Sequence, residues 1–247
     1  MFVGVIVVWY NKIMLESHPA FKDRPHADDA PKKEGSPKYK SVFVDFGSGH
    51  NPVAESHPER FSGDTLYIGV DYDEEALKSG QQKFLDKISG SKLDQPANVL
   101  FVRAEKGALP FGDQSVSELH FGNVFGEPYH LEFKKDERPE QVFEIKDKEK
   151  VSTFIQDAHR ILNDGGVLSI LETYTPVDSN EKVLKEVLKE NGFKIDRIVR
   201  GRDPEFKIEL QKYNTSSQNI QGRGHFLGEP YILYAHKETK RSFFNRE

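Results

Sequence analysis

Short apolar runs alternate with helical stripes from Ser41 onward, and few folds accommodate that order. A run of four to eight apolar residues rich in β-branched side chains is typical of a strand buried on both faces. Strands that alternate with helices are typical of βα units and a mainly parallel sheet. The expected strands are Val42–Phe46, Leu66–Asp71, Val99–Val102, Glu118–Phe121, Val167–Leu171, Phe193–Val199 and Tyr231–Ala235. The sequence therefore predicts an α/β protein with a doubly wound sheet.

Helical stripes separate these runs. Asp73 begins one helix, in which one face carries Leu77, Phe84, Leu85 and Ile88. A second helix is predicted over Val151–Leu162, because its apolar residues recur at helical spacing and Gly165 and Gly166 follow it. A third stripe ends at Gly192 and runs through Val183, Leu184, Val187 and Leu188. About 30 mostly polar residues separate the last two expected strands, and their pattern predicts neither a helix nor a strand. A loop of this length is usually functional or mobile.

The first 40 residues differ in character from the rest of the chain. Residues 16–40 are rich in Pro, Lys, Asp and His without apolar periodicity, which is typical of a linker. We therefore expect an N-terminal segment over residues 1–40 and one folded domain over residues 41–247. The apolar run Phe2–Tyr10 is far shorter than the roughly 20 residues of a membrane-spanning helix. It fits a strand or a docking segment, so neither a membrane partner nor a signal peptide is expected.

The composition excludes several kinds of site. The chain contains no cysteine, which excludes disulfides, thiolate zinc sites and a cysteine nucleophile, and fits a reducing, cytoplasmic location. The nine histidines lack close pairing and acidic partners, so no metal site is predicted. The net charge of −5 argues against a strongly cationic nucleic-acid binder. However, Lys and Arg outnumber Asp and Glu by 11 to 7 from Lys194 to Glu247.

A strand that runs into a glycine turn forms the first candidate site. The strand Val42–Phe46 contains Asp45, and it is followed by Gly47, Ser48 and Gly49. Glycines at this point let the backbone approach a ligand closely and adopt dihedral angles that other residues avoid. An ordinary βα turn without a ligand is the alternative interpretation.

Two acidic residues follow the next two expected strands. Asp71 ends the second strand, and in a doubly wound sheet this position adjoins the glycine turn. A carboxylate there can accept hydrogen bonds from both hydroxyls of a ribose. A helix N-cap role for Asp71 or Asp73 is the alternative. After the third strand, Glu105 is placed to accept a hydrogen bond from an adenine amino group, with apolar neighbours beside the ring.

Taken in this order, the motifs resemble those of the class I S-adenosylmethionine-dependent methyltransferases, over roughly Ser41 to Glu172. The likeness also includes Leu109-Pro110-Phe111 and the segment from His159 to Leu168. It implies a doubly wound, Rossmann-like α/β fold with a mostly parallel seven-stranded sheet and an antiparallel last strand. It also implies S-adenosyl-L-methionine as cofactor, bound by Asp45, Gly47, Ser48, Gly49, Asp71, Tyr72, Ala104, Glu105 and Asn123.

The glycine turn departs from this family's pattern at its end. Asn51 stands where a third glycine is common, and Pro52 follows it, so the turn into the first helix is expected to be tighter or differently aimed. A nicotinamide-binding Rossmann domain is the nearest rival, but its third glycine would fall at Pro52. The long polar connection before the final strand fits the methyltransferase topology better.

The methyl acceptor is expected above the carboxyl ends of the strands, near residues 122–130. Methyl transfer from a sulfonium is an in-line displacement, so the protein mainly aligns donor and acceptor and excludes water. Asn123 is a candidate to orient the methionine end of the cofactor or the acceptor. Glu127 or His130 is a candidate general base, needed only if the nucleophile must lose a proton. A plain surface position is the alternative for each, and further candidates are Glu172 and Tyr174.

The sequence leaves the acceptor class open. The acidic net charge slightly favours a small molecule, with a lid formed by residues 201–228. The segment from Glu118 to Gly126 distantly resembles RNA base methyltransferases that act on ribosomal RNA adenine or transfer RNA guanine, and the basic C-terminal stretch would suit phosphate contacts. However, Asn123-Val124-Phe125-Gly126 replaces the Asp-Pro-Trp-Pro type motif of the transfer RNA enzymes. A non-catalytic nucleotide-binding module is the third alternative, and no oligomeric state is predicted.

Overall fold

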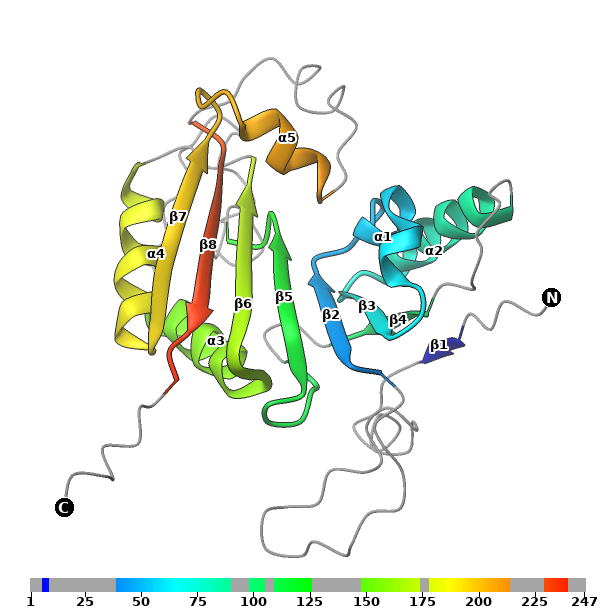
Figure 1. Cartoon of the computed structure of the whole chain (residues 1–247), viewed down its shortest axis with the longest axis horizontal. Helices are drawn as coiled ribbons and strands as arrows, with labels where there is room; N and C mark the ends of the chain where they lie inside the picture. Colours follow the sequence, from blue (N-terminus) through cyan, green and yellow to red (C-terminus); the bar gives the residue numbers. More distant parts are fainter. Residues whose placement is uncertain are drawn as a thin grey trace, which may run out of the picture.

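One mixed sheet of eight strands organises the chain (Figure 1). The structure, a computed structural model, describes residues 6–8, 39–89, 98–104, 109–125, 148–173, 178–213 and 229–239. The strands lie in the order β1-β4-β3-β2-β5-β6-β8-β7. Their bounds are β1 Ile6–Val8, β2 Ser41–Phe46, β3 Thr65–Asp71, β4 Val99–Arg103, β5 Val116–Gly122, β6 Leu162–Glu172, β7 Phe193–Arg200 and β8 Tyr231–Lys237.

The direction of the strands confirms the predicted fold. Neighbouring strands from β1 to β6 are parallel, whereas β8 is antiparallel to both β6 and β7. All seven expected strands are present, with the last one antiparallel. The sheet has one strand more than predicted, because β1 pairs with Leu100, Phe101 and Val102 of β4 at the edge. This extra strand lies within the apolar run Phe2–Tyr10.

Helices cover both faces of the sheet (Figure 1). Their bounds are α1 Val53–Ser56, the 3-10 helix η1 Pro58–Phe61, α2 Glu74–Ser89, α3 Lys148–Ile161, α4 Asp178–Glu190 and α5 Phe206–Gln211. One apolar cluster contains side chains of α3 and α4, and a second contains side chains of α1, η1, α2 and α5. The two clusters occupy opposite faces of the sheet, as expected for a doubly wound fold.

Strand β2 shows how the sequence builds both clusters at once. Successive side chains of a strand point to opposite faces. Val44 and Phe46 therefore join the α3/α4 cluster, and Phe43 joins the cluster on the other face. All three side chains are buried. Apolar residues at consecutive positions are consequently needed here, instead of the alternation typical of a half-exposed strand.

Two elements differ from the sequence-based expectation. The helix expected over Val151–Leu162 is α3, which ends before Leu162 because that residue pairs with Val116 as the first residue of β6. The polar connection between the last two strands contains α5, whose buried apolar residues are Phe206 and Leu210. A six-residue helix with only three apolar residues, of which Ile208 is exposed, gives little periodic signal, which is why the sequence did not predict it.

Helix α2 packs closely against the turn that follows β2. A Cβ atom on Gly80 of α2 would lie 2.4 Å from the carbonyl oxygen of Gly49 and 3.0 Å from Cδ of Pro52. Both neighbours are held by backbone geometry and cannot move aside as a flexible side chain would. Glycine at position 80 therefore sets how closely α2 approaches the glycine turn.

We expect Gly80→Ala to lower the free energy of unfolding by about 1–2 kcal/mol. Overpacking of this kind costs about 1–3 kcal/mol, and the higher helix propensity of alanine offsets up to about 1 kcal/mol. Urea denaturation measures the change. Gly112→Ala is the control, because a Cβ atom there meets nothing within 4 Å. Equal stability of the two variants would show that α2 can move away from the turn at no cost.

Candidate functional site

The carboxyl ends of the central strands stop at one level of the sheet. Phe46 of β2 pairs with Phe121 of β5, which pairs with Ile170 of β6. The residues just after this row therefore meet along one edge, where open α/β sheets bind their ligands. The sequence-predicted residues that the structure brings to this edge are Gly47, Ser48, Gly49, Asp71, Tyr72, Ala104 and Asn123.

The turn after β2 requires glycine at two positions. Gly47 and Gly49 have φ angles of +82° and +45°, a region that favours glycine. A Cβ atom on Gly47 would also lie 2.9 Å from the carbonyl oxygen of Gly122 in β5. The backbone N–H groups of Gly47 and Ser48 both donate to the carbonyl oxygen of Val70, at 2.8 and 3.1 Å. The turn is thus bound tightly to β3 and pressed against β5.

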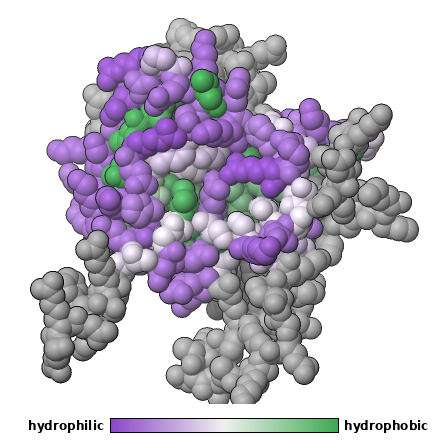
Figure 2. All heavy atoms as spheres, viewed as in Figure 1, coloured by the Kyte–Doolittle hydropathy of each residue, from purple (hydrophilic) through white to green (hydrophobic). Residues whose placement is uncertain are grey.

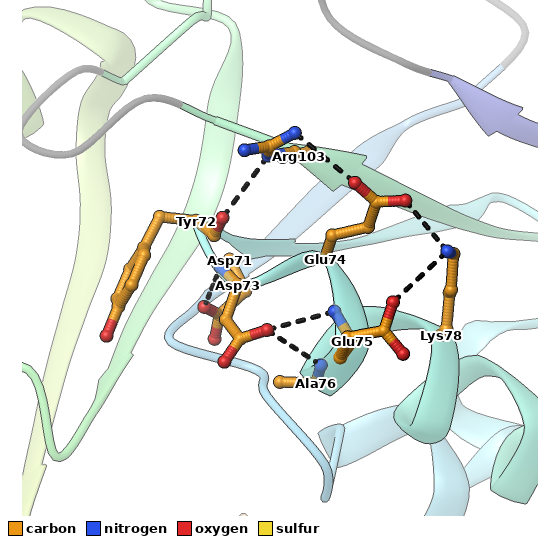
Figure 3. Close-up of polar contacts among 8 residues, drawn as sticks. All are labelled: Asp71, Tyr72, Asp73, Glu74, Glu75, Ala76, Lys78 and Arg103. Carbon is orange, nitrogen blue, oxygen red and sulfur yellow. Dashed lines mark hydrogen bonds and ion pairs between the residues drawn. The ribbon is translucent and has the colours of Figure 1, made fainter.

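Asp71 joins the glycine turn to the start of α2, and Figure 3 shows the α2 side of this connection. Its Oδ2 accepts a hydrogen bond from the Gly49 N–H at 2.9 Å, and its Oδ1 accepts one from the Asp73 N–H at 2.9 Å. Burial raises the pKa of Asp71, and these two N–H donors oppose the rise. Asp73 itself caps α2, because its Oδ1 accepts from the N–H groups of Glu75 and Ala76. Each oxygen of Asp71 keeps a lone pair for a ligand hydroxyl.

Tyr72 presents an aromatic ring beside Asp71. Figure 3 shows its side chain pointing away from α2, and the residue is 36% exposed. Arg103 fixes the backbone here, because its Nε donates to the carbonyl oxygen of Tyr72 and its Nη1 contacts Glu74, both at 3.3 Å. A planar group bound at this edge would find the tyrosine ring already positioned next to the carboxylate.

Ala104 extends the edge to β4. Its N–H donates to the carbonyl oxygen of Asp71 at 3.0 Å, which holds the end of β4 against the end of β3. Its side chain is buried beneath the edge. The other predicted site residues fall outside the part of the chain that the structure describes, and their roles stay predictions: Glu105, Glu127, His130 and Tyr174.

Asp45 lies beneath the glycine turn and is only 2% exposed. Its Oδ2 accepts a hydrogen bond from the Val53 N–H at 2.9 Å, at the start of α1, and one from the Tyr67 hydroxyl at 2.5 Å. Burial, the largest influence, raises the pKa of Asp45 to about 6 despite these donors. The carboxylate therefore holds α1 and β3 together under the turn.

We expect the burial of Asp45 to make stability fall as pH rises from about 4 to 6. The folded-state pKa of about 6 exceeds the ordinary value of 3.8 for an aspartate, so the folded protein binds the proton more tightly than the unfolded chain. The free energy of unfolding then decreases by up to about 3 kcal/mol across this range. Asp45→Asn removes the titration but keeps an acceptor oxygen. Urea denaturation at several pH values should show this variant gaining on the wild type as pH rises.

Asp86→Asn is the matched control for this pH series, because Asp86 is an exposed residue of α2. It measures how the loss of one exposed carboxylate changes stability over the same pH range. A constant stability difference from the wild type for Asp45→Asn would mean that Asp45 titrates normally in the folded protein.

The ends of β5 and β6 are fastened together at the carboxyl edge of the sheet. Asn123 has a φ of +57°, and its Oδ1 accepts from both the N–H and the hydroxyl of Thr173, each at 2.7 Å. Among the described residues, its Nδ2 has no hydrogen-bond acceptor. Glu172 is fully buried, and its Oε1 accepts from the Phe125 N–H at 2.8 Å. These contacts fix the direction in which the chain leaves β5.

No protein-family model and no curated protein sequence matches this chain. Solved structures do match it. A methyltransferase from Methanosarcina mazei, described as S-adenosylmethionine-dependent, has a TM-score of 0.52 at 14% identity, over 81% of this chain and 93% of that chain. One from Aquifex aeolicus has a TM-score of 0.50 at 16% identity, over 81% and 83%. The chain has the fold of a class I S-adenosylmethionine-dependent methyltransferase.

A third structure shares this methyltransferase fold and is known with ligands. The geranyl diphosphate C-methyltransferase of Streptomyces coelicolor A3(2) has a TM-score of 0.51 at 12% identity, over 80% of this chain and 70% of that chain. That enzyme was solved in complex with Mg²⁺, geranyl-S-thiolodiphosphate and S-adenosyl-L-homocysteine.

In the part of our chain that the structure describes, no group of His, Cys, Asp or Glu could hold a metal ion. No helix there is long and apolar enough to cross a membrane.

The packing of α1 and α2 around the turn accounts for the missing third glycine of the motif. In the usual motif that glycine allows close packing between helix and strand. Here Pro52 precedes α1 in an extended conformation, and α1 is a single turn. Asn51 accepts a hydrogen bond from Nζ of Lys83 on α2 at 2.8 Å. The close approach is made instead at Gly80 of α2, a residue that the sequence motifs did not indicate.

A pocket of about 390 Å³ opens on the α1/α2/α5 face, away from the carboxyl edge. Beside it His120 of β5 is buried, its Nδ1 lies 2.9 Å from the Ser169 hydroxyl, and its ring stacks on Tyr213 with centroids 4.1 Å apart. Burial lowers the pKa of His120 to about 3, so it stays neutral. Arg60 and Glu118, which line the pocket, pair with each other at 2.8 Å. Charges here are balanced, and the network ties α5 to the sheet.

Proposed function

We propose that this protein is an S-adenosylmethionine-dependent methyltransferase with a small-molecule acceptor. The observation that carries the proposal is the placement of Asp71 at the carboxyl edge of β3. Both of its oxygens are fixed by backbone N–H groups, and both can still accept a hydrogen bond from a hydroxyl. A ribose diol is the ligand group that matches two adjacent acceptors of this kind.

The neighbouring residues fit the rest of the cofactor. Tyr72 offers an aromatic face for the adenine ring beside the ribose, with Ala104 directly after β4, and with Glu105, the next residue in the sequence, predicted to contact the adenine. The turn at Gly47 and Gly49 lets the methionine end approach the backbone, which a side chain at either position would obstruct. When bound, S-adenosylmethionine supplies an electrophilic methyl group on a sulfonium.

The chain must also hold the acceptor in line with the methyl group and the sulfur of the cofactor. Asn123 has its Oδ1 fixed by Thr173, so its Nδ2 is directed by that contact and can donate to the cofactor carboxylate or to the acceptor. Glu172 keeps the following segment in place through Phe125. We assign general base catalysis to Glu127 or His130 for acceptors that must lose a proton.

A small-molecule acceptor is supported by the net charge of −5, which disfavours a polyanion such as RNA. The related fold of a geranyl diphosphate C-methyltransferase supports the same class. An RNA acceptor would instead appear as tight, strongly salt-dependent binding of an oligonucleotide by the purified protein.

Isothermal titration calorimetry with S-adenosylmethionine, S-adenosylhomocysteine and NAD tests the proposal. Binding of both adenosyl ligands at micromolar concentration, and no binding of NAD, is the expected result. Binding of NAD alone would favour a dinucleotide-binding Rossmann domain. Absence of all binding would identify the chain as a non-catalytic protein that keeps the fold.

A further inference from the structure

A second pocket, of about 350 Å³, opens at the far end of the carboxyl edge, beyond β8. Four of the six residues that line it are cationic, and it lies between α4, the end of β7 and the start of β8. The six residues are Glu181, Lys182, Lys185, Arg200, Arg202 and Glu229. Hydrophilic residues dominate the surface over β7 and α4 in Figure 2. We refer to this feature as the basic pocket.

Strand register puts the basic pocket level with the candidate site. Glu172 of β6 pairs with Tyr231 of β8, and Tyr231 pairs with Arg200 of β7. Arg200 therefore stands at the same height as the residues that follow β5. Strands lie about 4.8 Å apart, so the three steps from β5 to β7 place the pocket roughly 14 Å from Asn123 along the edge. One extended small molecule can span that distance.

The charges of the basic pocket do not cancel. Glu181 accepts a hydrogen bond from Arg200 at 2.7 Å and lies 3.5 Å from Nζ of Lys185. Glu229 lies 3.5 Å from Nε of Arg202. Lys182 is exposed and has no carboxylate partner among the described residues. Two carboxylates thus face four cations, and each arginine keeps N–H donors for a further acceptor.

The local backbone adds to this positive potential. Helix α4 begins at Asp178 and has 13 residues, so Glu181 ends its first turn and Lys182 follows. The N–H groups at the start of a helix carry partial positive charge and favour anions. Glu181 also orients the two cations that it contacts, which lowers the entropy lost when a ligand orders them. Arginine and lysine together around a concave site are typical of phosphate recognition.

We propose that the basic pocket binds a phosphate group at the far end of the methyl acceptor. This inference rests on the proposed methyltransferase function, since it is the reacting end of the acceptor that lies near Asn123. The basic pocket has more cations than carboxylates, and the negative charge of a phosphate group about balances this excess. The phosphate oxygens also match the N–H donors of Arg200 and Arg202. The acceptor is then a phosphorylated compound that reaches from β5 to β7.

Titration calorimetry with inorganic pyrophosphate tests the pocket directly. The double variant Lys182→Gln/Arg202→Gln should bind pyrophosphate at least tenfold more weakly than the wild type. The matched control is Lys189→Gln/Lys194→Gln, which removes the same charge from exposed positions of α4 and β7 outside the pocket. It should change the affinity less than twofold. Wild-type binding should also weaken with rising salt, because the pocket is open to solvent.

A single-stranded RNA decamer separates the two sources of phosphate. A tenfold loss for the decamer in the pocket variant alone would assign the phosphate to an RNA backbone. Unchanged or absent decamer binding would assign it to a small phosphorylated acceptor. No pyrophosphate binding by the wild type, or equal losses in both double variants, would overturn the proposal. Pyrophosphate binding without any adenosyl binding would leave an anion site and remove its role in methyl transfer.

Discussion

Asp71→Asn is expected to weaken binding of S-adenosylmethionine by about 100-fold. Asparagine keeps one acceptor oxygen and places an NH₂ group where the second oxygen was. That group faces either the Gly49 N–H or the Asp73 N–H, both of which are donors. The ribose loses one charge-assisted hydrogen bond, and the turn loses one of its ties to β3. Such bonds are worth about 1.5–3 kcal/mol, and each 1.4 kcal/mol is tenfold in affinity.

Calorimetry on the purified variant measures this loss, and circular dichroism verifies that the variant is folded. Asp86→Asn on α2 removes the same charge from an exposed position and should leave the affinity within twofold. Wild-type affinity in the Asp71 variant would place the ribose elsewhere and remove the observation on which the proposed function depends.

Gly47→Ala is expected to lower the free energy of unfolding by about 3 kcal/mol. A left-handed backbone conformation costs alanine about 1–2 kcal/mol. The new Cβ atom would also lie 2.9 Å from the carbonyl oxygen of Gly122 and 3.0 Å from Cγ2 of Val124. Gly122 ends β5 and Val124 follows it, so relief of the clash displaces the point at which the chain leaves β5. Adenosyl affinity should fall together with stability.

Gly165→Ala is the control that separates the cost of backbone strain from the cost of the close atomic contact. Gly165 has a φ of +73°, close to the +82° of Gly47, but a Cβ atom there meets nothing within 4 Å. Its loss should be about 1–2 kcal/mol, from backbone strain alone. Urea denaturation of both variants then gives the cost of the contact as the difference. Equal losses would show that the turn has room for a side chain.

The central strands are predictable because burial on both faces favours apolar side chains at successive positions. Val42–Phe46 and Val167–Leu171 are apolar except for the buried Asp45 and Ser169, and both are strands of the sheet. The position of Asp71 is predictable for the same reason, since the end of a buried parallel strand has only one place in a doubly wound fold. At these residues the local sequence pattern is sufficient to predict the position in the fold.

Other features depend on partners that are remote in sequence. Nothing near Gly80 indicates that it meets the carbonyl oxygen of Gly49. The motif containing Asp45 indicates a ligand site, but it does not reveal that the Tyr67 hydroxyl occupies Oδ2. Likewise, the basic C-terminal stretch predicts an anion only in general terms. That Arg200 lies beside Glu181 follows from the pairing of β7 with β8, which no local pattern encodes.

The strands end side by side along one edge of the sheet. A ligand bound along that edge therefore stabilises the folded state of the whole sheet. The glycine turn, Asp71, the proposed acceptor side at Asn123 and the basic pocket come from residues between 46 and 229, so no short fragment of the chain carries all of them. A ligand that spans the edge acts as a cross-link between distant segments. At a concentration 100 times its Kd, it stabilises the folded state by about 2.7 kcal/mol. Hydrogen exchange should then slow in β7 and α4 as well as in the strands that touch the adenosyl group.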